Sequence, residues 1–364
     1  MNTRLVPQKI LYIASADGGG VLKKIEGFCK SAVNAGYVAE KAISEGKKNR
    51  QIHRVMQTMV KTDAKYIVLR SPNRKGLLYL HYLLRAKFQG KVIILDQPSP
   101  AATYIKEVSF QNRPFFNKTA KIFFTYVSCP LLFLISDRVI QYGEESAYFQ
   151  YFARHKTLLV GNGIDIKRLP LRVKEYPSAD DRIALVGVAA SISGWHGFDR
   201  VVCAMGEWKR RGKNPKVTFD IIGDNNTPDA EKIKQLIEEY GIDEDVTFCG
   251  YLSAEELNGL YSRESLAVAS LGIYRKGLST ASPLKIREYC LAGIPFITAG
   301  SDPDFSNDVP FRFVVSNNDG FEDIIQVFSQ FPISRNNFTD EEIRQYAIEH
   351  LSYDKKFKEI MNGL

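Results

Sequence analysis

The feature that most constrains the fold of this chain is an alternation of short apolar runs with longer helical segments. In the first half, five runs of strand length are separated by segments long enough for helices; they are KILYIAS, YIVLR, VIILD, RVIQ and TLLV, at residues 9–15, 66–70, 92–96, 138–141 and 157–160. Strands that alternate with helices are typical of a parallel, doubly wound sheet. We therefore predict an α/β domain in this half.

The alternation restarts in the second half. Five further runs are RIALVGV, VTFDII, VTFC, LAVASL and PFIT, at residues 182–188, 217–222, 246–249, 266–271 and 295–298. A chain of 364 residues is longer than a single core usually holds, so we expect a second doubly wound domain. The predicted linker is 161–176, which carries a Gly-Asn-Gly turn, Pro170 and alternating charge. We place the domains at 1–165 and 166–344.

The last stretch, residues 339–364, is predicted to be one capped helix. Acidic side chains fill its first turn, where they favour the start of a helix. Apolar side chains then follow at helical spacing; they are Ile343, Tyr346, Ala347 and Leu351.

Charge divides the chain into halves of opposite sign. Residues 1–170 carry 27 Lys and Arg against 11 Asp and Glu, a net charge of +16, and the remainder carries 22 against 30, a net charge of −8. We expect the first half to face something anionic, and charge alone leaves membrane headgroups, nucleic acid and a phosphorylated acceptor open. The five cysteines form no CxxC pair, which argues against a disulfide framework and fits a reducing compartment.

Two segments bear on the cellular location. The start, MNTRLVPQKI, lacks the apolar run of a signal peptide, so we expect a cytoplasmic protein. The most apolar stretch, 122–136, contains Pro130 and is shorter than the roughly 20 residues that span a bilayer, so we do not expect a transmembrane helix. Because Lys118, Lys121 and Arg138 flank it, this stretch is either a buried helix or part of a surface that lies on an anionic membrane.

The first candidate site is the glycine cluster that follows the first predicted strand, Gly18, Gly19 and Gly20. Backbone amides at the start of a helix bind phosphate oxygens, although glycine clusters also mark turns without a ligand. A nicotinamide-binding domain is the alternative, since Glu40 lies where a ribose-binding acid is expected. The GxGxxG pattern fails, however, because Lys23 occupies its third glycine position.

The second candidate site lies within residues 272–300. Ser282 and Pro283 start a predicted helix that contains Glu288, and basic side chains stand beside the preceding turn; they are Arg275, Lys276 and Lys285. Cations at a helix N-terminus suit a diphosphate, whereas an ordinary solvated helix face is the alternative reading of Glu288. Gly250 and Tyr251 follow a strand, where the aromatic ring either accepts a nucleotide base or packs in the core. The histidines show no metal-ligand spacing, so no metal site is predicted.

Several motifs of the second half occur together in one family. SPLKIREY at 282–289, AGIPFI at 292–297, WHGFDR at 195–200, FDIIGD at 219–224, VTFCGY at 246–251 and NGID at 162–165 resemble, in their order, family-4-type glycosyltransferases of bacterial surface-polysaccharide biosynthesis. The resemblance covers residues 157–300 and reaches the first half only in outline. It implies the GT-B fold, with two Rossmann-like domains facing across a cleft and residues 345–364 crossing back to the first domain.

The resemblance also implies roles for individual residues. Glu288 matches the second Glu of a Glu-x7-Glu donor motif, the residue that holds the nucleotide ribose, while Thr280 stands where the first Glu belongs. The family's Arg and Lys pair is missing near His196, so Lys285 or Arg275 is expected to neutralise the diphosphate. The remaining donor-side candidates are Ser282, Gly250 and Tyr251, and residues 18–20 would approach the diphosphate and acceptor from the other domain.

The predicted function is therefore that of a glycosyltransferase of the hexosyltransferase type. It would move a sugar from a nucleotide-diphosphate sugar, a UDP-sugar by expectation, to a saccharide or lipid-linked acceptor. Retention of configuration without a metal or a further cofactor is implied by the resemblance. The basic first half and the apolar stretch at 122–136 favour a place at the inner face of the cell membrane, and no nucleic-acid partner is expected. A nucleotide-binding or membrane-docking protein with a degenerate site is the alternative, and a nicotinamide oxidoreductase is the third.

Overall fold

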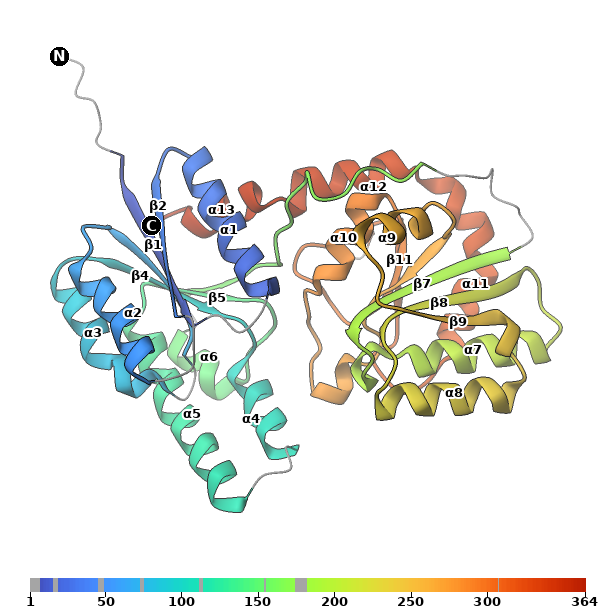
Figure 1. The fold of residues 1–364 in the computed structure, drawn as a ribbon, viewed down its shortest axis with the longest axis horizontal. Coiled ribbons are helices and arrows are strands. Elements are labelled where there is room, and N and C mark those ends of the chain that lie inside the picture. The colour runs from blue at the N-terminus through green and yellow to red at the C-terminus, as the bar shows by residue number, and fades with distance from the viewer. Residues whose placement is uncertain are drawn as a thin grey trace, which may run out of the picture. The chain divides into compact units, whose positions relative to one another are not determined.

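The computed structural model describes residues 7–15, 19–44, 49–72, 75–110, 114–153, 155–173, 182–306 and 308–364. The chain divides into two compact units (Figure 1). Unit 1 comprises Met1–Asp165 and Ser352–Leu364, and unit 2 comprises Ile166–Leu351.

Unit 1 contains a six-stranded sheet in which every pair of neighbouring strands is parallel. The strand order is β2-β1-β3-β4-β5-β6. Its strands are β1 (Lys9–Ser15), β2 (Val38–Ser44), β3 (Tyr66–Arg70), β4 (Val92–Gln97), β5 (Arg138–Gln141) and β6 (Thr157–Leu159). Its helices are α1 (Gly19–Asn34), α2 (Asn49–Lys61), α3 (Gly76–Phe88), α4 (Ala101–Phe110), α5 (Phe115–Ile135), α6 (Ala147–Ala153) and α13 (Tyr353–Met361).

Both faces of this sheet are buried, because successive side chains of a strand point to opposite sides. On β1, Leu11 and Ile13 face a core built with α2, α3, α5 and α6. Ile10 and Tyr12 face the opposite core, which is built with α1 and α13. This arrangement confirms the predicted doubly wound domain and explains why its strands are almost continuously apolar.

The apolar stretch at 122–136 lies within a longer helix than the sequence predicted. Helix α5 runs for 21 residues and is long and apolar enough, by length and composition, to cross a membrane. The length argument against a span was therefore wrong, because Pro130 does not end the helix. Proline leaves the carbonyl four residues earlier without its helical donor, and here the Tyr148 hydroxyl of α6 donates to the Tyr126 carbonyl at 3.3 Å.

The C-terminal stretch is not one helix. Helix α12 (Asp340–Tyr346) starts at a capping box formed by Thr339 and Glu342, as expected, but it ends in a wide turn over Ala347–Leu351. A second cap at Ser352 then starts α13. The apolar face predicted to cross back is thus divided, with Ile343, Tyr346 and Leu351 belonging to unit 2.

Helix α13 alone contacts α1 of unit 1. Its Phe357 ring lies edge-on to Phe28 at 5.2 Å and to Tyr37 at 5.5 Å. A Cβ at Gly27 would lie 2.3 Å from the Tyr353 ring, so the close approach of the two helices requires glycine there. The prediction of a terminal helix that returns to the first domain is confirmed for α13.

Unit 2 contains a second parallel sheet, with the strand order β12-β11-β10-β7-β8-β9. Its strands are β7 (Arg182–Ser191), β8 (Lys216–Asp224), β9 (Val246–Gly250), β10 (Leu266–Val268), β11 (Phe296–Ala299) and β12 (Arg312–Val315). Its helices are α7 (Phe198–Arg210), α8 (Pro228–Tyr240), α9 (Ala254–Tyr261), α10 (Leu284–Ala292), α11 (Glu322–Ser334) and α12.

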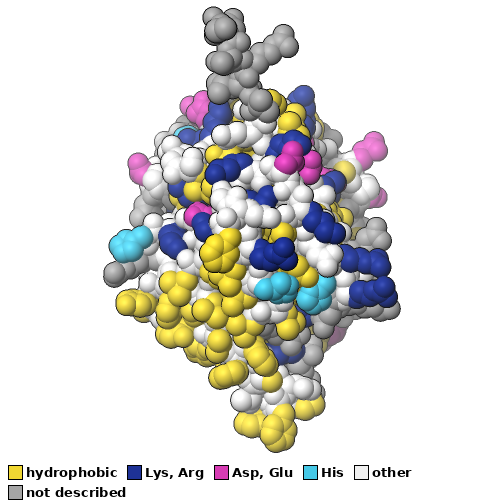
Figure 2. All heavy atoms as spheres, turned by 90° about the vertical axis from the view of Figure 1, so that its left-hand side faces the viewer, with side chains coloured by type: hydrophobic (Ala, Val, Ile, Leu, Met, Phe, Trp, Pro, Cys, Tyr) yellow, Lys and Arg dark blue, Asp and Glu magenta, His cyan; other side chains and the backbone are white. Residues whose placement is uncertain are grey.

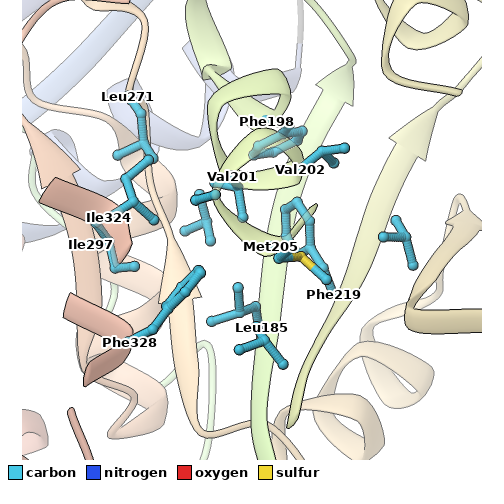
Figure 3. Close-up of a cluster of buried hydrophobic side chains, with 14 of the residues drawn as sticks. Leu185, Phe198, Val201, Val202, Met205, Phe219, Leu271, Ile297, Ile324 and Phe328 are labelled. Carbon is cyan, nitrogen blue, oxygen red and sulfur yellow. The ribbon is translucent and has the colours of Figure 1, made fainter. Parts of the chain in front are cut away.

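One face of this sheet carries a large apolar core (Figure 3). Phe198, Val201 and Met205 of α7 point toward Leu185 of β7 and Phe219 of β8, and α11 closes the same core. On the opposite face, the Tyr289 hydroxyl of α10 donates to the Val268 carbonyl at 3.2 Å and accepts from the Val188 amide at 3.1 Å. These two bonds fix α10 across β7 and β10, the strands that carry the candidate site.

Two strands escaped the sequence analysis, and both lie at sheet edges. β2 has the sequence VAEKAIS and β12 has the sequence RFVV. An edge strand has a neighbour on only one side, so it needs fewer apolar side chains than a central strand. The pattern used to find buried strands therefore passes over them.

Candidate functional site

The candidate site of unit 2 lies where the strand order reverses. β8 and β9 extend to one side of β7, and β10, β11 and β12 extend to the other. In doubly wound sheets, ligands bind outside the carboxyl ends of the strands at such a switch point. A ligand is therefore expected to contact the segments that follow β7 and β10.

These two segments are joined directly to each other. The Leu271 and Gly272 amides donate to the carbonyls of His196 and Trp195, at 2.9 and 3.1 Å. A Cβ at Gly272 would lie 2.4 Å from the Gly194 carbonyl oxygen, so the approach leaves no room for a side chain. The loops thus form one connected rim at the carboxyl edge of the sheet.

His196 lies in the turn near which the resemblance implied an Arg and a Lys, and it is neutral. Burial, together with the nearby charge of Lys285, lowers the pKa of His196 to about 2. Its Nδ1 accepts a hydrogen bond from the Ser193 amide at 3.1 Å, which places the ring proton on Nε2. The imidazole can donate one hydrogen bond, but it brings no positive charge to the rim.

Lys285 supplies a buried amine beside that imidazole. It lies in the first turn of α10 with only 9% of its surface exposed, and Nζ donates to the Ala269 carbonyl at 3.1 Å. The Phe198 ring centroid is 5.1 Å from Nζ. Burial lowers the pKa of Lys285 to about 7, and no carboxylate among the described residues opposes this shift. The amine is therefore only partly protonated near neutral pH, and an anion beside it would favour its charged form.

Glu288 lies three residues after Lys285, on the same face of α10. Its Oε1 forms an ion pair with Arg168 Nη1 at 2.7 Å, and 14% of its side chain is exposed. The carboxylate is thus oriented by a partner from the segment that leads into unit 2. The alternative of an ordinary solvated helix face does not describe this mostly buried group.

Arg275 is held by acidic partners. It pairs with Asp199 at 2.7 and 2.9 Å and with Asp319 at 2.9 Å, and Nη1 also donates to the Gly194 carbonyl at 2.6 Å. The hydrogen bonds that Arg275 donates to Asp199 and Asp319 raise its pKa above the ordinary arginine value. Arg275 therefore ties the two loops together, and its contact with a donor phosphate stays a prediction.

The other donor-side candidates surround the same edge. Thr280 is buried, and its Oγ1 lies 2.6 Å from Ser301 Oγ. Ser282 is also buried, just before α10. Gly250 ends β9 with φ at +67°. The next residue, Tyr251, is 73% exposed, and its hydroxyl donates to the Ala190 carbonyl at 2.8 Å. Tyr251 is therefore not the core residue that was the alternative reading.

The glycine cluster belongs to unit 1. Gly18 lies outside the described residues, and Gly19 and Gly20 are the first two residues of α1. A cluster around the buried Asp96, at the carboxyl end of β4, was not predicted from the sequence. The Asp96 carboxylate accepts hydrogen bonds from the Tyr12 hydroxyl, from Lys24 Nζ at 3.0 Å and from Arg70 Nη1 at 3.1 Å. An acid at the end of an apolar strand was the signal that would have found it.

The second unit matches a known family in sequence. Residues 174–303 match the family model described as glycosyl transferases group 1. These residues are a group 1 glycosyltransferase domain. The predicted family and enzyme class are confirmed, and the alternatives of a protein without turnover and of a nicotinamide oxidoreductase are set aside.

Solved glycosyltransferases share the fold along the whole chain. The lipopolysaccharide outer core galactosyltransferase WaaB in its apo form aligns with a TM-score of 0.62 at 13% identity, over 98% of this chain and 100% of that one. A glycosyltransferase from Rickettsia africae ESF-5 aligns equally well, with a TM-score of 0.62 at 15% identity over 98% and 100%. The pneumococcal O-GlcNAc transferase GtfA, solved with UDP and GlcNAc, has a TM-score of 0.51 at 12% identity over 87% and 61%.

No curated protein matches the chain in sequence. The glycosyltransferase has the GT-B fold of two Rossmann-like sheets, and it transfers a sugar from a nucleotide sugar. Within the described ranges, no group of three or more His, Cys, Asp and Glu side chains is placed to hold a metal ion.

Proposed function

We propose that this glycosyltransferase moves a hexose from a UDP-sugar to a saccharide or lipid-linked acceptor in polysaccharide biosynthesis, at the cytoplasmic face of the cell membrane. Two printed descriptions support the choice. WaaB is named as a galactosyltransferase of the lipopolysaccharide outer core, and GtfA was solved with UDP. In this chain, a donor-binding site is supported by the placement of Lys285 and Glu288 on one face of α10 at the switch point.

Lys285 has the properties expected of a diphosphate ligand. Its burial disfavours the charged form of the amine, and a diphosphate would restore that charge by ion pairing. The start of α10 adds backbone amides and the positive end of the helix dipole. Together they would stabilise the negative charge that develops on the leaving diphosphate, which is the role that a metal ion plays in other enzymes.

Glu288 would accept hydrogen bonds from the ribose hydroxyls, and Arg168 would orient its carboxylate. The exposed ring of Tyr251 offers a surface on which a nucleobase stacks, and the Thr280 hydroxyl, the Ser282 hydroxyl and Arg275 remain candidates for contacts with the sugar and phosphates. We propose retention of configuration, with an oxygen of the leaving phosphate accepting the proton of the attacking hydroxyl.

Calorimetric titration with UDP and with UDP-sugars tests the donor site. Glu288→Gln keeps the shape of the side chain but weakens charge-assisted hydrogen bonds worth about 1.5–3 kcal/mol, so donor affinity is expected to fall about tenfold or more. Glu238→Gln, an exposed position on α8, is the matched control and should leave affinity unchanged. Chelation of metals with EDTA should also leave it unchanged.

Arg168→Met removes the ion-pair partner of the Glu288 carboxylate and leaves that carboxylate in place. If Glu288 binds ribose itself, removing Arg168 leaves that ligand in place, and the affinity should fall far less than in Glu288→Gln. An equal loss in both variants would mean that the ion pair, not the carboxylate, is what the donor needs. Unchanged affinity in a folded Glu288→Gln variant would exclude the ribose role.

A further inference from the structure

An exposed apolar face on unit 1 remains outside the donor site. Helix α5 buries one side against α3 and α6, through residues that include Thr125, Cys129 and Leu132. On the opposite side it exposes a stripe at helical spacing, whose members are Phe116, Phe123, Val127 and Leu134. Phe116 is 84% exposed and Phe123 is 60% exposed.

Neighbouring helices extend this stripe into a wider surface, which we call the α5 face. Its further members are Phe115, Phe124 and Tyr126 of α5, Leu84 and Phe88 of α3, and Tyr148 and Tyr151 of α6, all of them exposed. Figure 2 shows hydrophobic side chains gathered over the lower part of unit 1, at the height where Figure 1 draws α5. Contiguous apolar surface of this kind marks an interaction site.

The side-chain charges on the same three helices are all positive, which favours a negatively charged partner. Their cations are Arg85 and Lys87 of α3 and Lys118 and Lys121 of α5, and Lys87 already forms an ion pair with Asp137 at 2.6 Å. None of the three helices contains an Asp or a Glu in its sequence. An apolar face with basic side chains around it and tyrosines among its aromatics is typical of a surface that lies on an anionic bilayer.

The packing of α5 decides how it would meet the bilayer. Only 33% of the most apolar stretch of α5 is buried, so most of that stretch lies outside the core to which Cys129, Leu132 and Phe133 contribute. Its buried side is nevertheless fixed to α3 and α6, with the Tyr148 hydroxyl bound to the Tyr126 carbonyl. A helix held along one side in this way offers only its exposed stripe to lipid and lies in the interface plane.

We propose that the α5 face docks this enzyme on anionic lipid, with the exposed phenylalanines inserted at the level of the headgroups and Arg85, Lys118 and Lys121 paired with lipid phosphates. The proposal does not depend on the donor or the acceptor, because it concerns a surface of unit 1 alone. A second copy of the chain and a protein partner are the other occupants to be tested.

Co-sedimentation of the full chain with vesicles is the experiment. We expect binding to vesicles of phosphatidylcholine with phosphatidylglycerol, little binding to phosphatidylcholine alone, and release as salt rises toward about 0.5 M. The double variant Lys118→Gln and Lys121→Gln should lower the partition coefficient about fivefold for each charge removed. Lys213→Gln, an exposed position in unit 2, is the matched control and should bind as the wild type does.

The apolar contribution is tested with Phe116→Ser and Phe123→Ser together, which should abolish sedimentation. Ile333→Ser is the matched control, because Ile333 is also exposed but lies on α11 of unit 2. Phe116→Trp gives a readout in a folded protein. Its fluorescence, measured above that of Trp195 and Trp208, should shift to the blue on anionic vesicles.

Three results would overturn the proposal. Absence of vesicle binding would do so, as would equal binding to neutral vesicles at every salt concentration. The third is a dimer in analytical ultracentrifugation that Phe116→Ser and Phe123→Ser convert to a monomer, without any effect of lipid. That result would assign the α5 face to a second copy of the chain.

Discussion

Each unit holds a lysine with little exposed surface near the carboxyl edge of its sheet, with 17% of the Lys24 side chain exposed and 9% of Lys285, and the two lysines differ in what surrounds them. Lys24 of unit 1 lies beside Asp96, whose carboxylate also binds Arg70 and the Tyr12 hydroxyl. Lys285 of unit 2 has a backbone carbonyl and an aromatic ring as its neighbours. The carboxylate of Asp96 balances the positive charge of Lys24, whereas no carboxylate among the described residues balances that of Lys285.

The pKa values follow this difference. Burial lowers the pKa of Lys24, but Asp96 opposes the shift and leaves it at about 8. Burial acts alone on Lys285 and takes it to about 7. Burial would raise the pKa of Asp96, yet Lys24 and Arg70 outweigh it and lower the value to about 2. The charge of Lys24 is balanced inside the fold, whereas we propose that the charge of Lys285 is balanced by the diphosphate of the donor.

The largest expected effect comes from removing the compensating acid. Asp96→Asn leaves Lys24 and Arg70 buried side by side, and losing one partner of a buried pair typically costs about 3–5 kcal/mol of unfolding free energy. Urea unfolding followed by circular dichroism should show an early transition. The fluorescence of Trp195 and Trp208, both in unit 2, gives the internal reference.

Asp63→Asn is the control for this variant, because Asp63 forms an exposed ion pair with Lys9. Such pairs contribute at most about 1 kcal/mol. If Asp96→Asn unfolds no earlier than Asp63→Asn, the cluster around Asp96 does not hold unit 1 together, and the contrast between the lysines fails.

The next effect is on donor binding, and it should separate the two lysines. Lys285→Met removes the charge that we assign to the diphosphate, so UDP-sugar affinity should fall about tenfold or more while stability is unchanged or higher. Lys24→Met should do the reverse, lowering the stability of unit 1 and leaving UDP-sugar affinity unchanged. Calorimetry and urea unfolding of both variants measure this; equal affinities for the donor would contradict the assignment.

The smallest effect is a dependence on pH. Lys285 binds its proton more weakly in the folded chain than in the unfolded chain, so its contribution makes stability rise with pH above about 7, up to the ordinary lysine value near 10.4. A bound diphosphate restores the proton, so UDP-sugar affinity should fall about fivefold between pH 7 and pH 8. Titrations at both pH values check this, and Lys285→Met should show no such fall.

How much of the fold and of the candidate site the sequence could predict depends on how far apart in the chain the contacting residues are. The fully apolar central strands and the run from Ser282 to Glu288 are local patterns, and the structure places them as strands and as the start of α10. The pairing of Glu288 with Arg168 joins residues far apart in the chain, as does the cluster around Asp96. No spacing rule reaches such contacts, because the fold alone brings them together.

The position of α13 has a consequence for the order in which the protein is made. Unit 2 is continuous in the chain, whereas unit 1 contains the first 165 residues and the last 13. Phe357 and Ile360 of α13 belong to the core that unit 1 builds on α1. During synthesis, unit 1 therefore waits for part of its interior until residues 352–364 have been added, whereas all residues of unit 2 have been added before them.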